Sequence, residues 1–203
     1  MLGGGETVTA RAVILAAPAP RAAAILEPLA PGPAAFLADI PFVSTATILL
    51  GFRREDVAHP LNGYGFVVPA QEGVRATAVT FVSTKLPGRA PAGHVLLRVF
   101  VGGARDPQSL ELDDDALTGG VLTELAGVLG LRAAPLLKRV YRWPSATPQL
   151  EVGHLERFAA VEREVATIPG LFLAGAGLRV TGIPDCIGDG RRSAAAAAAF
   201  LSA

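Results

Sequence analysis

The residue types best suited to hold a ligand are the glycines near the carboxyl terminus. Gly175 and Gly177 follow a short apolar run, and Gly182 precedes Pro184 at the start of a helical pattern. Proline is favoured in the first turn of a helix, where its missing N–H has no partner in any case. The free N–H groups of a helix start can hold an anion, and glycine lets a ligand approach the backbone closely. A purely structural turn gives the same pattern, so the spacing alone leaves both interpretations open.

Several single side chains also suggest chemistry, and each has a structural alternative. His154 could be a base, but its place at a helix start favours capping or packing. Cys186 could be a redox thiol near a helix start, although without a partner cysteine a small buried residue fits better. Trp143 could border a ligand or simply close a strand end. Arg98 could pair with a carboxylate, but we favour a solvated strand face.

An acidic triplet, Asp113 to Asp115, precedes an amphipathic pattern. Negative charge is favoured at a helix cap and first turn, so the triplet predicts a helix start. A metal site would need further ligands, and the neighbouring sequence offers none. The apolar residues at helical spacing are Leu117, Val121, Leu125 and Leu129, with Leu122 and Val128 beside them.

Alternating strand and helix patterns must position these residues. Runs of β-branched and apolar residues predict strands over 7–17, 43–52, 63–69, 74–84, 94–101, 136–143 and 171–174. Helical spacing predicts helices over 21–29, 117–129, 151–166 and 184–203. Glycine-containing turns at 71–73 and 91–93 join the middle strands, which indicates a mixed or antiparallel sheet.

Composition excludes several classes of protein. The chain has 203 residues, of which 51% are hydrophobic and 18% charged, which is unlike a disordered segment. A formal net charge of zero gives no general electrostatic reason to bind nucleic acid. The single cysteine excludes an internal disulfide and a cysteine-rich zinc site. The single cysteine fits a reducing compartment, so we expect a cytoplasmic protein. No apolar run approaches the roughly 20 residues that span a bilayer, and no signal peptide is visible.

Specific sequence blocks follow one another along the chain. They are residues 12–18 (AVILAAP), 63–69 (GYGFVVP), 83–91 (STKLPGRAP), 96–103 (LLRVFVGG), 148–149 (PQ), 152–154 (VGH), 169–175 (PGLFLAG) and 182–187 (GIPDCI). In this order they resemble the carboxyl-terminal half of the protoporphyrinogen oxidase family. These are oxygen-dependent flavin enzymes of haem synthesis, whose actinobacterial and firmicute members are coproporphyrinogen oxidases. Such chains are about twice as long and begin with a glycine-rich βαβ unit. No G-x-G-x-x-G stands between a strand and a helix here.

The resemblance implies FAD as the cofactor and places residues around it. It matches Gly182, Ile183 and Pro184 to the segment beside the isoalloxazine and ribityl chain. Asp185 would open the last helix, and Gly175 would end the strand beneath the cofactor. Trp143 matches a tryptophan that flanks the flavin in bacterial members. The implied cofactor-binding residues are therefore Gly182, Ile183, Pro184, Trp143, Gly175 and Asp185. The resemblance gives no catalytic side chain and no metal ligand.

The resemblance also implies a substrate and a reaction. A porphyrinogen, either coproporphyrinogen III or protoporphyrinogen IX, would transfer hydride to the flavin repeatedly, and dioxygen would reoxidise the flavin to give hydrogen peroxide. The two substrates differ in propionate and vinyl groups, and the sequence does not separate them. The implied partners are the porphyrinogen, dioxygen and the missing amino-terminal half.

The fold class that follows is mixed α/β. Residues 1–35 and 141–203 are expected to form the carboxyl-terminal part of an FAD-binding, Rossmann-like domain of the amine-oxidase type. Residues 36–140 are expected to form an antiparallel-rich substrate-domain sheet with apolar side chains over the tetrapyrrole.

Two alternatives remain. The chain could be a non-catalytic remnant or a split subunit that needs a flavin-binding partner, and we expect no turnover by the chain alone. It could also be another flavin amine-oxidase relative, such as a carotenoid desaturase, although residues 182–187 argue against that. Leu150 and Leu178 replace aromatic residues that are usual in the family. These two replacements either alter the edge of the expected substrate and flavin pocket or indicate relaxed selection in a fragment without function.

Overall fold

Residues 7–203 are described by the computed structural model, in which the chain divides into two units. Of the described residues, unit 1 combines 7–42 with Pro148–Ala203, and unit 2 is Val43–Thr147. The chain therefore leaves unit 1 after Phe42 and returns to it at Pro148. The domain limits expected from the sequence lie after residues 35 and 140. Assigning the units to flavin and substrate domains stays a prediction.

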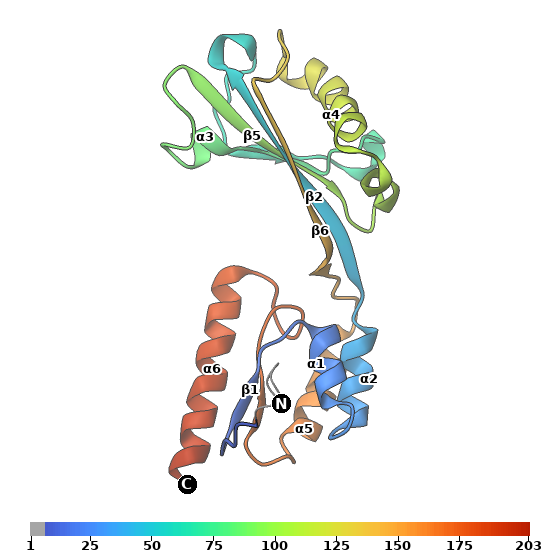
Figure 1. Cartoon of the computed structure of the whole chain (residues 1–203), viewed down its shortest axis with the longest axis vertical. Coiled ribbons are helices and arrows are strands. Elements are labelled where there is room, and N and C mark those ends of the chain that lie inside the picture. Colours follow the sequence, from blue (N-terminus) through green and yellow to red (C-terminus); the bar gives the residue numbers. More distant parts are fainter. Residues whose placement is uncertain (1–6) are drawn as a thin grey trace. The chain divides into compact units, whose positions relative to one another are not determined.

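Unit 1 is built on two short parallel strands, β1 (Val13–Leu15) and β7 (Leu171–Leu173). Its helices are α1 (Ala19–Leu26), α2 (Pro31–Asp39), α5 (His154–Val165) and α6 (Ile183–Ser202). Figure 1 shows α6 on one side of β1 and the other three helices on the opposite side. Unit 1 is thus a layered α/β structure, as the sequence indicates.

The core of unit 1 is one apolar cluster between its helices and β7. It includes Leu26 of α1, Leu37 of α2, Phe158 of α5 and Leu173 of β7, all buried. Small alanines on α1 let that helix pack closely on α2. This packing fixes the carboxyl ends of the two strands, where the predicted site lies.

Unit 2 holds a five-stranded sheet in the order β3-β4-β5-β2-β6. The strands are β2 (Phe42–Arg53), β3 (Gly65–Val67), β4 (Ala78–Phe81), β5 (His94–Gly102) and β6 (Leu137–Pro148). The pairs β2–β5, β3–β4 and β4–β5 are antiparallel. The expected antiparallel-rich sheet in a mixed α/β chain is therefore confirmed. Short helical turns lie at α3 (Val82–Lys85), Arg54–Asp56, Ala70–Glu72 and Pro107–Glu111.

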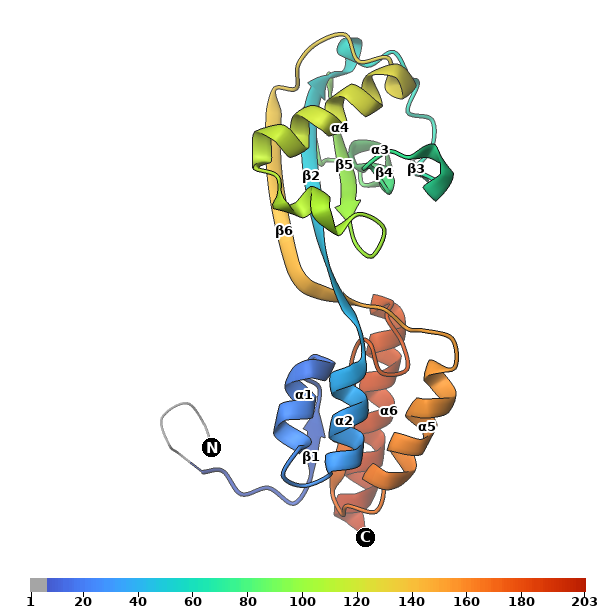
Figure 2. The same cartoon turned by 90° about the vertical axis from the view of Figure 1, so that its right-hand side faces the viewer.

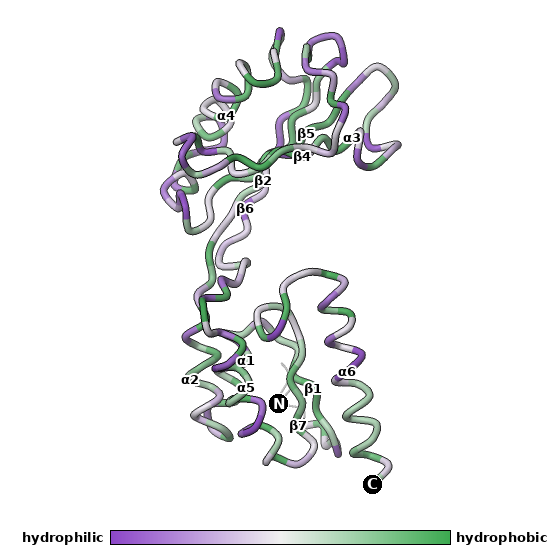
Figure 3. The backbone as a smooth tube through the Cα atoms, turned by 180° about the vertical axis from the view of Figure 1, so that it is seen from behind, coloured by the Kyte–Doolittle hydropathy of each residue, from purple (hydrophilic) through white to green (hydrophobic). Residues whose placement is uncertain are grey.

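One face of this sheet is covered by α4 (Asp114–Leu129), which lies across it in Figure 2. Alternate residues of the central strands, such as Leu50 and Leu97, are fully buried in a cluster with Leu125 of the helix. Figure 3 colours much of β2 as hydrophobic and β6 in paler shades. A more polar edge strand is a common protection against pairing with another chain.

The acidic triplet begins α4, as predicted. Asp113 is the N-cap residue, and its side chain accepts a hydrogen bond from the Ala116 N–H at 2.8 Å. Asp115 accepts one from Lys138 Nζ at 2.9 Å. Within residues 7–203 no cluster of His, Cys, Asp and Glu could hold a metal ion. The part of the chain that the structure describes also contains no helix able to span a membrane.

The Asp115–Lys138 pair gives a prediction about titration. The hydrogen bond and charge of Lys138 lower the pKa of Asp115 below its ordinary value. Lys138→Ala is expected to raise that pKa toward the ordinary value, which NMR titration of the Asp115 carboxyl would measure. Because the pKa is depressed in the folded state, the pair stabilises above the ordinary pKa, and this contribution is lost as the pH falls. An unchanged Asp115 pKa in Lys138→Ala would contradict the assignment, and Lys85→Ala serves as the control.

Candidate functional site

The carboxyl ends of β1 and β7 meet in unit 1. The Ala174 N–H donates to the Leu15 carbonyl at 3.1 Å, directly after β7. Gly175 follows with a φ of +125°, and a Cβ there would lie 3.5 Å from the Ala16 carbonyl oxygen. Ligands of open α/β sheets bind outside the carboxyl ends of the strands, where glycine allows close approach. The Gly175 turn therefore occupies the expected place for a ligand.

A buried carboxylate holds this turn. Asp189 of α6 is completely buried, and its Oδ2 accepts the Gly175 N–H at 3.0 Å. Its Oδ1 accepts hydrogen bonds from Arg179 Nη1 at 2.9 Å and from Arg192 Nη2 at 3.0 Å. Burying an ionised carboxylate requires such partners. Asp189 thus couples the position of the glycine turn to the first half of α6.

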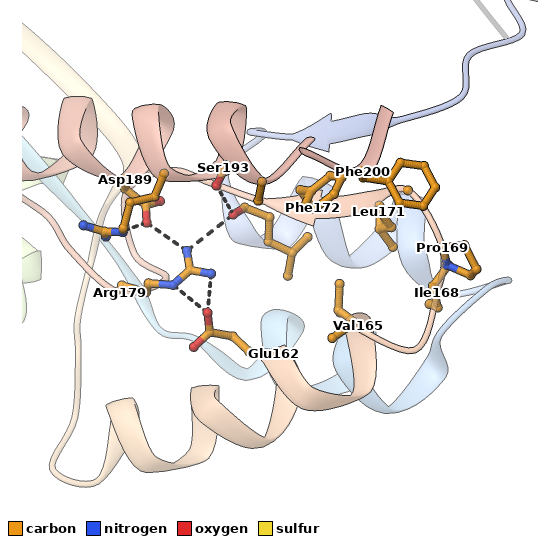
Figure 4. Close-up of a pocket in the computed structure, with 15 residues that line it drawn as sticks. Glu162, Val165, Ile168, Pro169, Leu171, Phe172, Arg179, Asp189, Ser193 and Phe200 are labelled. Carbon is orange, nitrogen blue, oxygen red and sulfur yellow. Dashed lines mark hydrogen bonds and ion pairs between the residues drawn. The ribbon is translucent and has the colours of Figure 1, made fainter. Parts of the chain in front are cut away.

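Arg179 extends the cluster to α5, as Figure 4 shows. Its Nε donates to Glu162 Oε1 at 2.7 Å, and its Nη1 lies 3.4 Å from the Leu173 carbonyl. Because Glu162 and Asp189 both pair with Arg179, its positive charge is already compensated. The cluster therefore links α5, β7 and α6 through hydrogen bonds and ion pairs. It offers no uncompensated positive charge that could bind an anion.

A pocket of about 620 Å³ lies beside this cluster. Apolar side chains from α5, the following loop, β7 and α6 line most of it, namely Val165, Ile168, Leu171, Phe172 and Phe200 (Figure 4). The Arg179 cluster closes one part of its wall. None of the residues predicted to bind the cofactor lines this pocket.

The start of α6 is the second part of the predicted site. Gly182 is the N-cap residue with extended backbone, Pro184 lies in the first turn, and no side chain of residues 7–203 caps the helix. Ile183 is 78% exposed, which is unusual for a large apolar side chain. The first N–H groups of a helix have no partner within it and attract electron-rich groups. The Asp185 carboxylate also lies at this end, where it stabilises the helix dipole.

The structure places the predicted cofactor residues in both units. Gly175, Gly182 and the residues after Gly182 lie in unit 1, where Asp189 ties the turn to α6. Trp143 lies in unit 2 on β6, and its Nε1 is 3.4 Å from Thr47 Oγ1. Its side chain is half exposed, so it is not a core residue.

His154 is a packing residue, in agreement with the alternative that we favoured. It is buried, and its Nε2 lies 2.6 Å from the Leu178 carbonyl. Its ring is parallel to that of Phe158, with 6.3 Å between the ring centroids. A ring enclosed in this way has no open path to a substrate. Cys186, the single cysteine of the sequence, is half-buried and forms no disulfide.

Sequence reasoning missed Asp189, Arg179 and Glu162. A signal for the first of these is present in α6. Asp189, Ser193 and Ala197 are spaced by four residues and are all buried, so they share the inner face of the helix. An acidic residue on the inner face of an alanine-rich helix requires a partner, which Arg179 and the Gly175 N–H provide.

Comparison with known proteins places the chain among flavoproteins. The family of flavin containing amine oxidoreductases matches residues 2–198. Coproporphyrinogen III oxidase of Bacillus subtilis (strain 168) is 35% identical over 202 residues, which cover 98% of this chain and 42% of that relative. Coproporphyrinogen III oxidase of Propionibacterium freudenreichii subsp. freudenreichii is 37% identical over 199 residues, covering 95% of this chain and 36% of that relative.

A solved structure gives the same result. A crystal structure from Exiguobacterium sp. 255-15, named for protoporphyrinogen oxidase, superposes with a TM-score of 0.75 and 31% identity. The superposed region covers 94% of the present chain and 40% of the Exiguobacterium chain. The present chain spans about two fifths of the length of these relatives. The resemblance and the amine-oxidase type of fold are therefore confirmed.

Proposed function

The chain belongs to the family of flavin containing amine oxidoreductases, and on that premise we propose that it forms part of a porphyrinogen oxidase of haem synthesis. It supplies one part of the flavin site and the sheet that receives the substrate. The observation that carries this proposal is the pairing of the Gly175 turn with α6 through buried Asp189. The names of the relatives support the substrate class.

The residues of unit 1 suit one edge of FAD. Gly175 has no side chain in the way, and the uncapped start of α6 offers N–H groups to electron-rich atoms. The exposed Ile183 side chain would cover an apolar ring and keep water from it. When bound, flavin would supply an acceptor for the hydride of a porphyrinogen carbon–hydrogen bond, the substrate would also lose a proton, and dioxygen would take up the hydride and a proton as hydrogen peroxide. The protein contributes position and shielding.

The face of the unit 2 sheet opposite α4 suits the tetrapyrrole. Thr47 alternates with buried Ile48, so it lies on this open face, and the hydrogen bond from Trp143 puts that ring there too. Leu49 and Phe100 are half-buried on the same face. A largely uncharged surface with aromatic side chains fits a wide apolar ring. We therefore assign this face to the porphyrinogen.

A specific observation supports a partner segment next to unit 1. Within residues 7–203, β1 pairs with β7 alone, and Val13 and Ile14 are 52% and 40% exposed. Parallel strands are normally buried on both sides and belong to larger sheets. We propose that a further parallel strand, from a dinucleotide-binding unit, completes this edge. The alternative of a split subunit rests on the same observation.

Flavin binding tests the part of the proposal that concerns unit 1. Gly175→Val is expected to weaken FAD binding by about tenfold or more, because a β-branched residue is strained at positive φ. Titration of FAD with the purified chain, followed by quenching of flavin fluorescence, measures the dissociation constant. Gly188→Ala is the matched control, since a Cβ at that position of α6 meets nothing within 4 Å.

Two results would count against this assignment. One is equal FAD affinity of Gly175→Val and the native chain, with circular dichroism showing that both are folded. The other is an equal loss of affinity in Gly188→Ala, which would point to a general effect on α6.

A further inference from the structure

Arg98 is a charged residue in the middle of the open sheet face. In the register of the sheet it stands opposite Leu49 of β2 and opposite Thr80 of β4. Along β5, Leu96 and Phe100 share its face. All of these neighbours are uncharged, so the sheet itself offers the guanidinium no counter-charge.

One polar atom of Arg98, the Nε, has no hydrogen-bond partner within residues 7–203. This nitrogen is also buried. The five strands of the sheet contain no Asp or Glu. The guanidinium carbon lies 4.8 Å from the centre of the Phe100 ring, which holds the group over the face. A buried donor without a partner is rare and calls for an explanation.

We propose that Arg98 recognises a carboxylate substituent of the tetrapyrrole. This inference rests on the proposed function and adds one residue that selects the substrate by charge. Arginine pairs with carboxylates through parallel hydrogen bonds, and the pair is stronger where water is excluded. The apolar neighbours would meet the ring while Arg98 holds one propionate. The occupant of this face is therefore an apolar ring that carries carboxylate side chains.

Porphyrin binding to the purified chain tests this inference. The probe is coproporphyrin III, the stable oxidised form, and its binding is followed by quenching of Trp143 fluorescence. Arg98→Gln is expected to bind it about tenfold more weakly, because a hydrogen bond to a charged group is lost. Arg98→Lys should recover part of the affinity, because it restores the charge without the planar fork.

Two controls separate charge recognition from a packing effect. The tetramethyl ester of coproporphyrin III has no carboxylate, so the native chain and Arg98→Gln should bind it equally. Arg89→Gln changes an exposed arginine of the turn before β5, outside the sheet, and should leave coproporphyrin III binding unchanged.

The outcomes distinguish this inference from the proposed function. If Arg98→Gln binds coproporphyrin III as tightly as the native chain does, Arg98 is not the recognition residue, while the function stands. If Arg98→Gln also loses affinity for the ester, its role is structural and the inference is overturned. If the native chain binds neither porphyrin, the assignment of the sheet face fails, and the Arg98 inference fails with it.

Discussion

Replacing Asp189 with alanine is expected to lower the free energy of unfolding of unit 1 by about 3 kcal/mol. The carboxylate is completely buried and accepts hydrogen bonds from the Gly175 N–H, Arg179 and Arg192. Its removal leaves the Gly175 N–H and one side of Arg179 without a partner. The measurement is hydrogen exchange of the amides of β7 and α6, with thermal unfolding followed by circular dichroism.

The control for this prediction is another acidic residue of unit 1. Glu151 pairs with Arg157 at 3.5 Å, but both side chains are more than half exposed. Exposed pairs contribute less than about 1 kcal/mol, so Glu151→Gln should change little. Equal protection of α6 amides in Asp189→Ala and Glu151→Gln would contradict the central position that we give to Asp189.

Replacing Leu125 with alanine is expected to destabilise unit 2 by about 3 kcal/mol. Leu125 is 2% exposed and joins α4 to the buried face of the sheet. The single tryptophan of the chain, Trp143, lies in this unit, so its fluorescence reports unfolding there. Denaturant unfolding followed at the tryptophan emission measures the change.

Val128→Ala is the matched control on the same helix. Val128 is 60% exposed, so its truncation removes little buried area, and alanine has the higher helix propensity. The expected change is within about 0.5 kcal/mol. A similar loss of stability in both variants would mean that α4 does not pack through the face that contains Leu125.

Most strands and longer helices could be predicted from the sequence because their patterns are regular. The alternation over 43–52 and 94–101 corresponds to β2 and β5, which are buried on one face. The strand predicted over 74–84 is longer than the observed strand, which is β4 (Ala78–Phe81), and the helical turn α3 follows it directly. Periodicity alone did not mark that change.

The prolines explain the helix that was missed. The sequence predicts a helix over 21–29 and none after it, because prolines such as Pro31 and Pro33 commonly follow a helix end, whereas α2 begins at Pro31. Proline is tolerated in a first turn because the N–H that it lacks has no helical partner there. The same residue therefore ends one helix or begins the next, and only tertiary packing of Leu37 distinguishes the two.

The site could be predicted only in part. Glycine and proline spacing identified the Gly175 turn and the start of α6, because those residue types carry a backbone requirement. The cluster of Asp189, Arg179 and Glu162 depends on contacts between α5 and α6 that no local pattern encodes. The unsatisfied Nε of Arg98 likewise depends on sheet register, which the sequence does not fix.

Porphyrinogen oxidation by a chimera tests the central claim most directly. The chimera joins residues 7–203 to the part of Bacillus subtilis coproporphyrinogen III oxidase that this chain does not match. With FAD, dioxygen and coproporphyrinogen III, we expect porphyrin fluorescence and hydrogen peroxide to form, and neither to form with the chain alone. Gly175→Val in the chimera should abolish most of this activity. A folded, flavin-loaded chimera that forms no porphyrin would contradict the account.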